Sequence, residues 1–317
     1  MVIPITQVAK GIFRIGPLDT KRVTAATSPY LVVGSNQAMV LEPGEEGQVP
    51  ELIQAIKDCD VDLNRITYVW PSHIHLHHMQ GVPTLLEKLT KAKVLVHPRA
   101  VPHLIDPTRL VASSIEAWGD KCYGPFRPIA KDRIMTVEDK QVIDLGGREL
   151  EIIWAPGHAP HHMGLFDRNT RALFPGDLVT FPGYGRPRGR HDIRPPLFDV
   201  EQFVASVNRF RTYKPSMLLI FNHIGGSLDA DDTLKWAAED HLALERICLD
   251  GLRKKLTFRE IVRQAEAYED KVAGKMTAET QQEEAVFSTG GLFGLIAYLK
   301  RKYPELELPA DARPRMR

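Results

Sequence analysis

The segment of this sequence best suited to chemistry is Ser72–His78, which reads Ser-His-Ile-His-Leu-His-His. It follows a β-branched and aromatic run, so we expect it where a strand ends and a helix begins. Alternate residues of an extended chain point the same way, so His73 and His75 can reach one point in space. His77 and His78, in the following helical turn, can face a second point nearby. Because imidazole is a common ligand of zinc and iron, this density of histidines predicts a metal site rather than a surface turn.

Three later segments each place a possible metal ligand just after a predicted strand, on a loop that contains Gly, Pro or Asn. They are Ala155–Pro160, which contains His158, then Phe174–Asp177 and Phe221–His223. Each one alone is a weak signal, because a single histidine after Pro-Gly is more often a turn residue than a ligand. Loops at strand ends are, however, where functional sites are usually built. The order and spacing of all the motifs together are specific.

In that order and spacing, roughly residues 8–225 resemble the metallo-β-lactamase superfamily, in the branch that includes glyoxalase II-like enzymes. The family motif is H-x-H-x-D-H, followed by a later histidine, a bridging aspartate and a final histidine. The resemblance implies an α+β fold, an αββα sandwich of two mixed sheets with outer helices. It also implies a centre of two metal ions. His73, His75 and His158 would hold the first ion, His78 and His223 the second, and Asp177 would bridge them.

Two positions depart from the family pattern. His77 stands where the family has an aspartate ligand, and Glu42-Pro43-Gly44 stands where Asp-Thr-Gly is usual. Replacing a carboxylate by an imidazole leaves the centre one unit more positive, which favours anionic substrates but weakens the hold on a second ion. We predict that His77 is a ligand; the alternatives are a single-ion site, or a His77 that only hydrogen-bonds to a ligand. Glu42 is a candidate outer carboxylate.

An arginine-rich loop follows Asp177 and is expected to pass near the site. The candidate substrate-binding residues on it are Arg186, Arg188, Arg190 and His191, with Arg194 just beyond. Guanidinium groups could clamp a carboxylate or phosphate of the substrate; the competing interpretation is a solvated loop. Tyr184, in the same loop, is a candidate proton donor or oxyanion partner.

Other residues near the motifs leave two interpretations open. His161 or His162 could line the mouth of the pocket, although a turn histidine without that role is the favoured interpretation. Trp118, Tyr123 and Phe126 could wall an apolar pocket, but core packing is the more common reason for such residues.

The composition restricts the partners. With 41 Lys+Arg against 40 Asp+Glu, the formal charge of the 317 residues is +1, so the chain has no strong field for nucleic acid. Three distant cysteines argue against a disulfide framework. The N-terminal residues lack a secretion signal and no apolar run is long enough for a membrane span, so we expect a cytoplasmic location and no membrane partner. A small, anionic substrate is expected, and a homodimer is a further expectation.

The elements predicted from periodicity alternate strands and helices up to Met217–Phe221, and helix formers dominate from Ala230. No G-x-G-x-x-G follows a strand, so two mixed sheets fit better than a doubly wound sheet. We predict a catalytic domain over 1–229 with an insertion over 98–134, a helical C-terminal extension over 230–303, and a loose tail over 304–317. Thr257 and Glu260 form a capping-box pattern for one of the late helices.

The resemblance implies a metal-dependent hydrolase in which a metal-bound hydroxide attacks a small ester, thioester, lactone or phosphoester. Asp177 would hold and orient the hydroxide, with His77 and Tyr184 as further catalytic candidates. Zinc is the expected cofactor, as one or two ions per chain, with iron or manganese as alternatives. Two other functions remain open: a di-iron redox or oxygen-binding protein on the same fold, and a metal-binding protein with an impaired second site.

Overall fold

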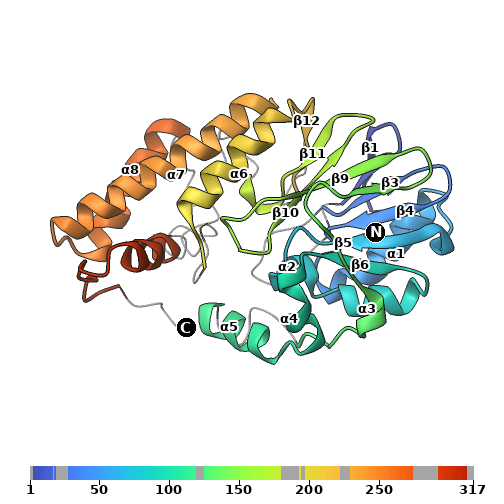
Figure 1. Ribbon diagram of the computed structural model, residues 1–317, viewed down its shortest axis with the longest axis horizontal. Helices are drawn as coiled ribbons and strands as arrows, with labels where there is room; N and C mark the ends of the chain where they lie inside the picture. Colours follow the sequence, from blue (N-terminus) through green and yellow to red (C-terminus); the bar gives the residue numbers. More distant parts are fainter. Residues whose placement is uncertain are drawn as a thin grey trace.

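A computed structural model describes residues 3–16, 18, 28–118, 125–179, 193, 197–221, 229–273 and 292–312. Several predicted site residues lie outside these ranges: His223, Tyr184, Arg186, Arg188, Arg190, His191 and Arg194, as does Tyr123. Within the described ranges, two β-sheets lie face to face with helices on their outer sides (Figure 1). This is the sandwich of two mixed sheets that the sequence predicts.

The first sheet contains seven strands among the described residues, in the order of the sequence. They are β1 (Ile5–Ala9), β2 (Ile12–Ile15), β3 (Tyr30–Val33), β4 (Ala38–Leu41), β5 (Ile66–Trp70), β6 (Lys93–Val96) and β7 (Ile134–Thr136). Strands β1 to β4 are antiparallel, whereas β4 to β7 are parallel. The sequence predicts one strand over Val8–Ile15, but the chain reverses at Gly11, whose φ of +66° suits glycine, and forms two paired strands.

The second sheet has the strand order β12-β11-β10-β9-β8 over the part of the chain that is described. Its strands are β8 (Val142–Asp144), β9 (Glu149–Trp154), β10 (Met163–Asp167), β11 (Ala172–Phe174) and β12 (Met217–Leu218). Strands β8 to β11 are antiparallel, and β11 and β12 are parallel. The last strand is shorter than the predicted Met217–Phe221.

The two sheets are held together by apolar side chains from their inner faces. Trp70 and Met39 of the first sheet are fully buried in one cluster with Leu165 and Phe174 of the second. Tyr30 packs edge-on against Phe174 at a ring separation of 5.2 Å, and its hydroxyl donates to the carbonyl of Ile220 at 2.9 Å. Burial of this apolar surface stabilises the sandwich and fixes the strand ends that carry the site.

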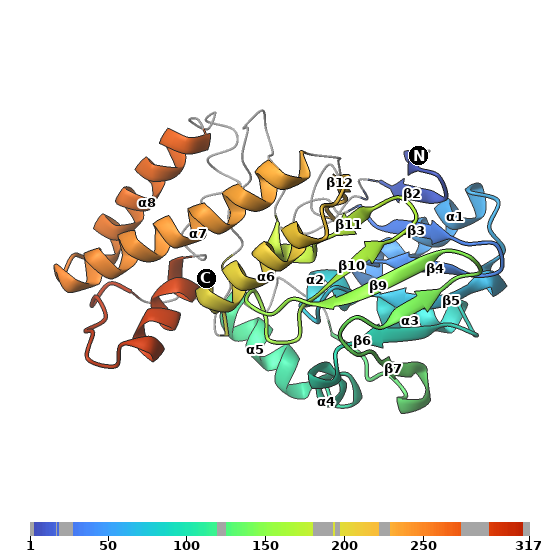
Figure 2. The same ribbon diagram turned by 45° about the horizontal axis from the view of Figure 1, so that its top comes forward.

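Helices cover the outer face of each sheet (Figure 2). On the first sheet these are α1 (Val49–Asp58), α2 (Leu76–Met79), α3 (Val82–Lys88), α4 (Val101–Ile105) and α5 (Thr108–Trp118). On the second sheet, α6 (Val200–Thr212) packs against the strands and α7 (Ala230–Arg253) packs on α6. Beyond them, α8 (Phe258–Ala273) and a helix over 292–302 extend the same apolar cluster away from the sheet. Short 3₁₀ helices are η1 (Glu46–Gln48), η2 (Leu63–Arg65), η3 (Pro98–Ala100), η4 (Lys131–Arg133) and η5 (Gly176–Leu178).

The C-terminal helices confirm the predicted helical extension, and α8 begins at the predicted capping box. The backbone N–H of Thr257 donates to the Glu260 carboxylate at 2.8 Å, and the backbone N–H of Glu260 donates back to the Thr257 hydroxyl at 3.3 Å. Part of the predicted loose tail is packed: Leu306 is buried against these helices, and Asp311 accepts from the backbone N–H of Phe258 at 2.8 Å. No helix among the described residues is long and apolar enough to cross a bilayer.

Candidate metal centre

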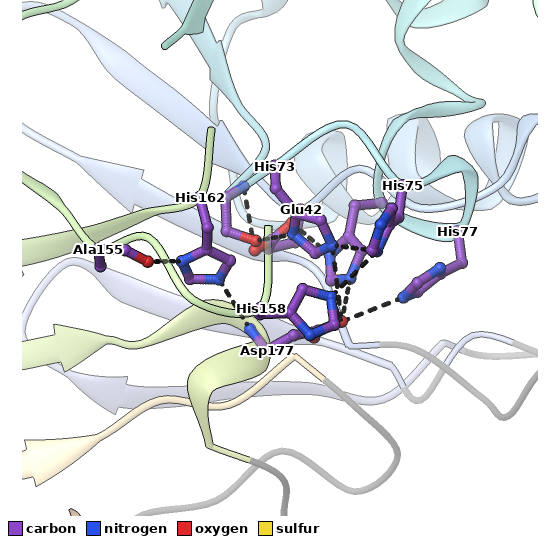
Figure 3. A network of polar contacts seen from close by, with 10 residues as sticks. Glu42, His73, His75, His77, Ala155, His158, His162 and Asp177 are labelled. Atoms are coloured by element: carbon purple, nitrogen blue, oxygen red, sulfur yellow. Dashed lines mark hydrogen bonds and ion pairs between the residues drawn. The ribbon is translucent and has the colours of Figure 1, made fainter. Parts of the chain in front are cut away.

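Three loops at one edge of the sandwich bring the candidate ligands together. The loop and short helix after β5 carry His73, His75, His77 and His78, the β9–β10 loop carries His158, and η5 after β11 carries Asp177 (Figure 3). All these side chains except that of His75 are buried. The structure therefore brings together, from positions up to about a hundred residues apart, every described residue that the sequence predicts as a ligand.

The first group contains His73, His75, His158 and Asp177, whose nearest ligand atoms all lie within 4.8 Å of one another. Nδ1 of His75 lies 2.8 Å from Nε2 of His73 and 3.0 Å from Nε2 of His158. Oδ2 of Asp177 lies 3.7 Å from His73 and 3.6 Å from His158. Three imidazole nitrogens and one carboxylate oxygen facing one point are a donor set that fits a divalent cation such as zinc.

The second group contains His73, His77, His78 and Asp177, also within 4.8 Å. Oδ2 of Asp177 lies 3.3 Å from Nε2 of His77 and 3.1 Å from Nε2 of His78. His77, which replaces the aspartate of the family motif, therefore turns its ring toward the shared carboxylate rather than toward solvent. This donor set also fits a cation, because Asp177 lies between the two groups and can bridge them.

The Glu42 carboxylate orients His78 from behind. Its Oε2 lies 2.7 Å from Nδ1 of His78, and its Oε1 accepts from the backbone N–H of Ser72 at 3.2 Å. Glu42 is buried and has a φ of +52°, a conformation that is strained for a residue other than glycine. The backbone at the end of β4 thus supports a side chain whose contacts fix which nitrogen of His78 faces Asp177, as expected for an outer carboxylate.

The electrostatics of the cluster follow from burial and from these contacts. Burial raises the pKa of Asp177, but attraction to His78 and hydrogen bonding with His77 outweigh burial and hold that pKa well below its usual range. Burial lowers the pKa of His78, but the carboxylates of Asp177 and Glu42 outweigh it and raise the pKa to about 10. Burial and the neighbouring imidazoles hold the pKa of His73 well below its usual value. Without a cation, the cluster thus keeps the Asp177 carboxylate charged beside the charged imidazole of His78.

Two residues contribute contacts that the sequence does not indicate. The hydroxyl of Ser72 lies 3.0 Å from Nδ1 of His73, which leaves Nε2 of His73 for the cluster. His162 is fully buried and contacts the backbone of both Ala155 and Asp177. A serine before the histidine motif, and a second histidine four positions after His158, carry no motif signal without the fold, so neither role is visible in the sequence.

The remaining candidates are placed less centrally. His161 as a whole is half-buried, its ring nitrogen Nδ1 is buried, and its ring lies 6.4 Å from the ring of His73, so its role at the pocket mouth stays a prediction. Phe126 is buried in the core under the helices of the first sheet, which supports core packing over a pocket wall.

The described residues thus form a sandwich of two mixed sheets with a histidine-rich cluster at one edge that could hold metal ions. The chain belongs to the metallo-β-lactamase superfamily, whose family model matches residues 24–223.

Several known proteins are similar to this chain in sequence or fold. A metallo-β-lactamase fold-containing protein, ST1585 of Sulfurisphaera tokodaii, is 26% identical over 211 residues, which is 64% of this chain and 74% of that protein. Its crystal structure superposes with a TM-score of 0.59 at 25% identity, over 74% of this chain and 86% of that one. The hydroxyacylglutathione hydrolase GloC of Haemophilus influenzae is 27% identical over 158 residues, 49% of this chain and 68% of that protein. A metallo-β-lactamase family protein, TTHA1429 of Thermus thermophilus, shares the fold with a TM-score of 0.64 at 15% identity, over 93% of this chain and 95% of that one.

Proposed function

We propose that the protein is a metal-dependent hydrolase of a small ester, thioester, lactone or phosphoester, with zinc as its ion. One observation carries the proposal: four imidazole nitrogens lie within 3.1 to 3.7 Å of the single oxygen Oδ2 of Asp177. Crowding four imidazoles around one buried carboxylate costs each of them its hydration, and the attraction between Asp177 and His78 offsets only part of that cost. A bound cation would compensate that loss.

Two sites would share the cluster. His73, His75 and His158 would hold the first ion, His77 and His78 the second, and Asp177 would contact both. His223 is proposed for the second ion from the sequence alone. Such an ion lowers the pKa of a bound water toward about 7 and polarises the bond to be cleaved.

The residues of the chain supply orientation. Oδ2 of Asp177 can accept a hydrogen bond from a water in the site and orient it, since it is a buried carboxylate that stays ionised at neutral pH. Glu42 holds the ring of His78 so that Nε2 faces Asp177. Burial of the cluster among the loops keeps bulk water away, which strengthens the electrostatic interactions within it.

The similar proteins favour a thioester as the first bond to test. One relative is named a hydroxyacylglutathione hydrolase, and another, from Cryptosporiopsis, is named an atrochrysone carboxyl ACP thioesterase and is 21% identical over 252 residues. The imidazole at position 77 supports an anionic substrate, because it leaves the centre more positive than the family motif would. Arg186, Arg188 and Arg190 are proposed to bind the anionic group, and Tyr184 to contact the developing oxyanion; both roles come from the sequence.

The test combines metal analysis with a panel of thioesters, esters, lactones and phosphoesters. We expect the protein to contain one or two zinc ions, to lose hydrolysis after chelation and to regain it with zinc. His158→Ala should lose hydrolysis, whereas His103→Ala, a histidine on α4 outside both ligand groups, should keep it. A fully metallated protein that hydrolyses none of these bonds would refute the proposal. Iron content with an absorption that responds to oxygen would instead support the redox alternative.

A further inference from the structure

His162 lies where the three ligand-bearing loops meet. It ends the β9–β10 loop that carries His158, and its ring centre is 5.1 Å from that of His73 and 5.9 Å from that of His158. The side chain is 0% exposed, so its polar atoms have no access to water. Buried imidazole nitrogens are costly unless they are hydrogen-bonded, and both nitrogens of His162 have partners.

The partners of His162 determine its protonation. The backbone N–H of Asp177 can only donate, so Nε2 of His162 accepts its hydrogen at 3.1 Å. The carbonyl of Ala155 can only accept, so Nδ1 of His162 carries the proton and donates at 3.1 Å. The side chain is therefore a neutral imidazole with one tautomer, and it joins the end of β9 to the residue proposed to bridge the two ions (Figure 3).

The backbone around His162 completes the junction. The carbonyl of His162 accepts from the N–H of Ala155 at 2.9 Å, and the N–H of Met163 donates to the carbonyl of Ser72 at 2.8 Å. A Cβ atom on Gly176 would lie 2.4 Å from Nε2 of His162. The chain before Asp177 therefore passes so close to the ring that the position suits glycine, which has no Cβ atom. His162 thus joins the end of β9 to the segment after β11, and the next residue, Met163, joins the same junction to the loop after β5.

We propose that His162 is a positioning residue, whose neutral imidazole sets the placement of Asp177 relative to the β9–β10 loop that carries His158. The inference rests on the proposed metal site but not on hydrolysis. It does not require His162 to touch an ion, since both of its nitrogens are occupied. Losing its hydrogen bonds would leave the Asp177 N–H unpaired and free the bridging carboxylate to move.

The test uses cobalt(II) alone as the probe, titrated into the metal-free full chain. His162→Phe keeps an apolar ring without hydrogen bonds, and we expect it to lower the cobalt affinity by about tenfold or more and to shift the visible absorption bands that report ligand geometry. His162→Gln offers an acceptor to the Asp177 N–H, and it should recover most of the affinity. The matched control is Asp167→Ala, which also removes a buried side chain with two hydrogen bonds, together with an ion pair to Arg148 at 3.5 Å, but lies at the far end of the following strand, β10. It should lower the thermal stability and leave the cobalt bands unchanged.

Three results would overturn the inference: a Phe variant that binds cobalt like the parent with the same bands, a Gln variant no better than Phe, or a control that shifts the bands equally. If the Phe variant does not fold, His162→Met against His162→Gln makes the same comparison at nearly equal side-chain length. A parent protein that binds no cobalt would instead refute the proposed metal site, so the two failures are distinguishable.

Discussion

The Glu42 carboxylate lies 2.7 Å from Nδ1 of His78, while Nε2 of the same ring lies 3.1 Å from Asp177. The two carboxylates therefore hold the imidazole from opposite sides: Glu42 orients the ring, and Asp177 contacts the nitrogen that faces the candidate metal centre. The family position usually carries an aspartate in Asp-Thr-Gly. Here a glutamate reaches His78 from a backbone with φ of +52°, which is a strained conformation for a residue other than glycine.

Glu42→Gln should weaken metal binding at His78 by about 10- to 100-fold. Ser72 and His78 contact different oxygens of Glu42. An amide replaces one of these oxygens by an NH2 group, which cannot accept, so one contact is lost. The measurement is zinc per chain in chelator-buffered solution, where the second ion should be lost first. Glu51→Gln, on the exposed side of α1, is the control of equal chemistry and should bind like the parent. Equal zinc affinity in the Glu42 and Glu51 variants would contradict the orienting role.

His77→Asp should have opposite effects on the metal-free and metal-bound protein. Without metal, the new carboxylate would lie beside Asp177, from which Nε2 of His77 is now 3.3 Å away, and the repulsion should lower the melting temperature. With metal, the added negative charge should raise the affinity for the second ion by roughly tenfold. Zinc titration and thermal melting in chelator check both. If hydrolysis rises, the native second site is impaired; if hydrolysis is abolished, His77 is a working ligand.

Much of the site was predictable because its residues follow strand ends at readable spacings. His73 and His75 alternate along the short turn between β5 and α2, and the apolar runs of β5, β9 and β11 place the following loops at one edge of the sandwich. Periodicity reports which elements form, and the strand-end motifs report where the ligands lie. The fold class followed from the resemblance that these motifs carry.

Contacts between distant loops were not predictable in this way. The roles of His162 and Ser72 depend on backbone groups far along the chain, which no local pattern encodes. The turn at Gly11 divides a run that has continuous strand character, because β propensity does not distinguish one long strand from a tight hairpin without a strong turn pair. The contact of Asp311 with the start of α8 is likewise a tertiary contact in a segment whose composition resembles a loose tail.

The stability of the metal-free protein should fall as the pH drops from about 6.5 to 5. Burial holds the pKa values of His73 and His162 well below the ordinary value of 6.5, so below that pH the unfolded chain binds protons that the folded chain excludes. Each group should contribute a slope of about 1.4 kcal/mol per pH unit. His78 acts in another window: its raised pKa stabilises the fold fully below 6.5, and that contribution is lost toward pH 10. The lowered pKa of Asp177 also stabilises the fold, and this contribution is lost only as the pH falls below about 4.

Urea unfolding in the presence of a chelator measures this pH dependence. His162→Phe should show a shallower slope between pH 6.5 and 5, by the contribution of one titrating group. An equal slope in the parent and the variant would mean that the folded state does not exclude a proton from His162.

Gly157→Ala should displace His158 and weaken the first ion site. Gly157 has φ of +140°, and a Cβ atom there would lie 2.3 Å from the Cα of Phe203 on α6. The added methyl group would therefore clash with the helix backbone, which cannot shift as a flexible side chain could. The β9–β10 loop would have to lift from the helix, and the adjacent His158 would move with it. We expect a loss of at least about 2 kcal/mol in unfolding free energy and a cobalt or zinc affinity reduced by about tenfold or more. Gly47→Ala is the matched control, since a Cβ atom at Gly47 meets nothing within 4 Å, and it should change neither quantity. If Gly157→Ala binds metal like Gly47→Ala, the seating of this loop on α6 does not determine the position of His158.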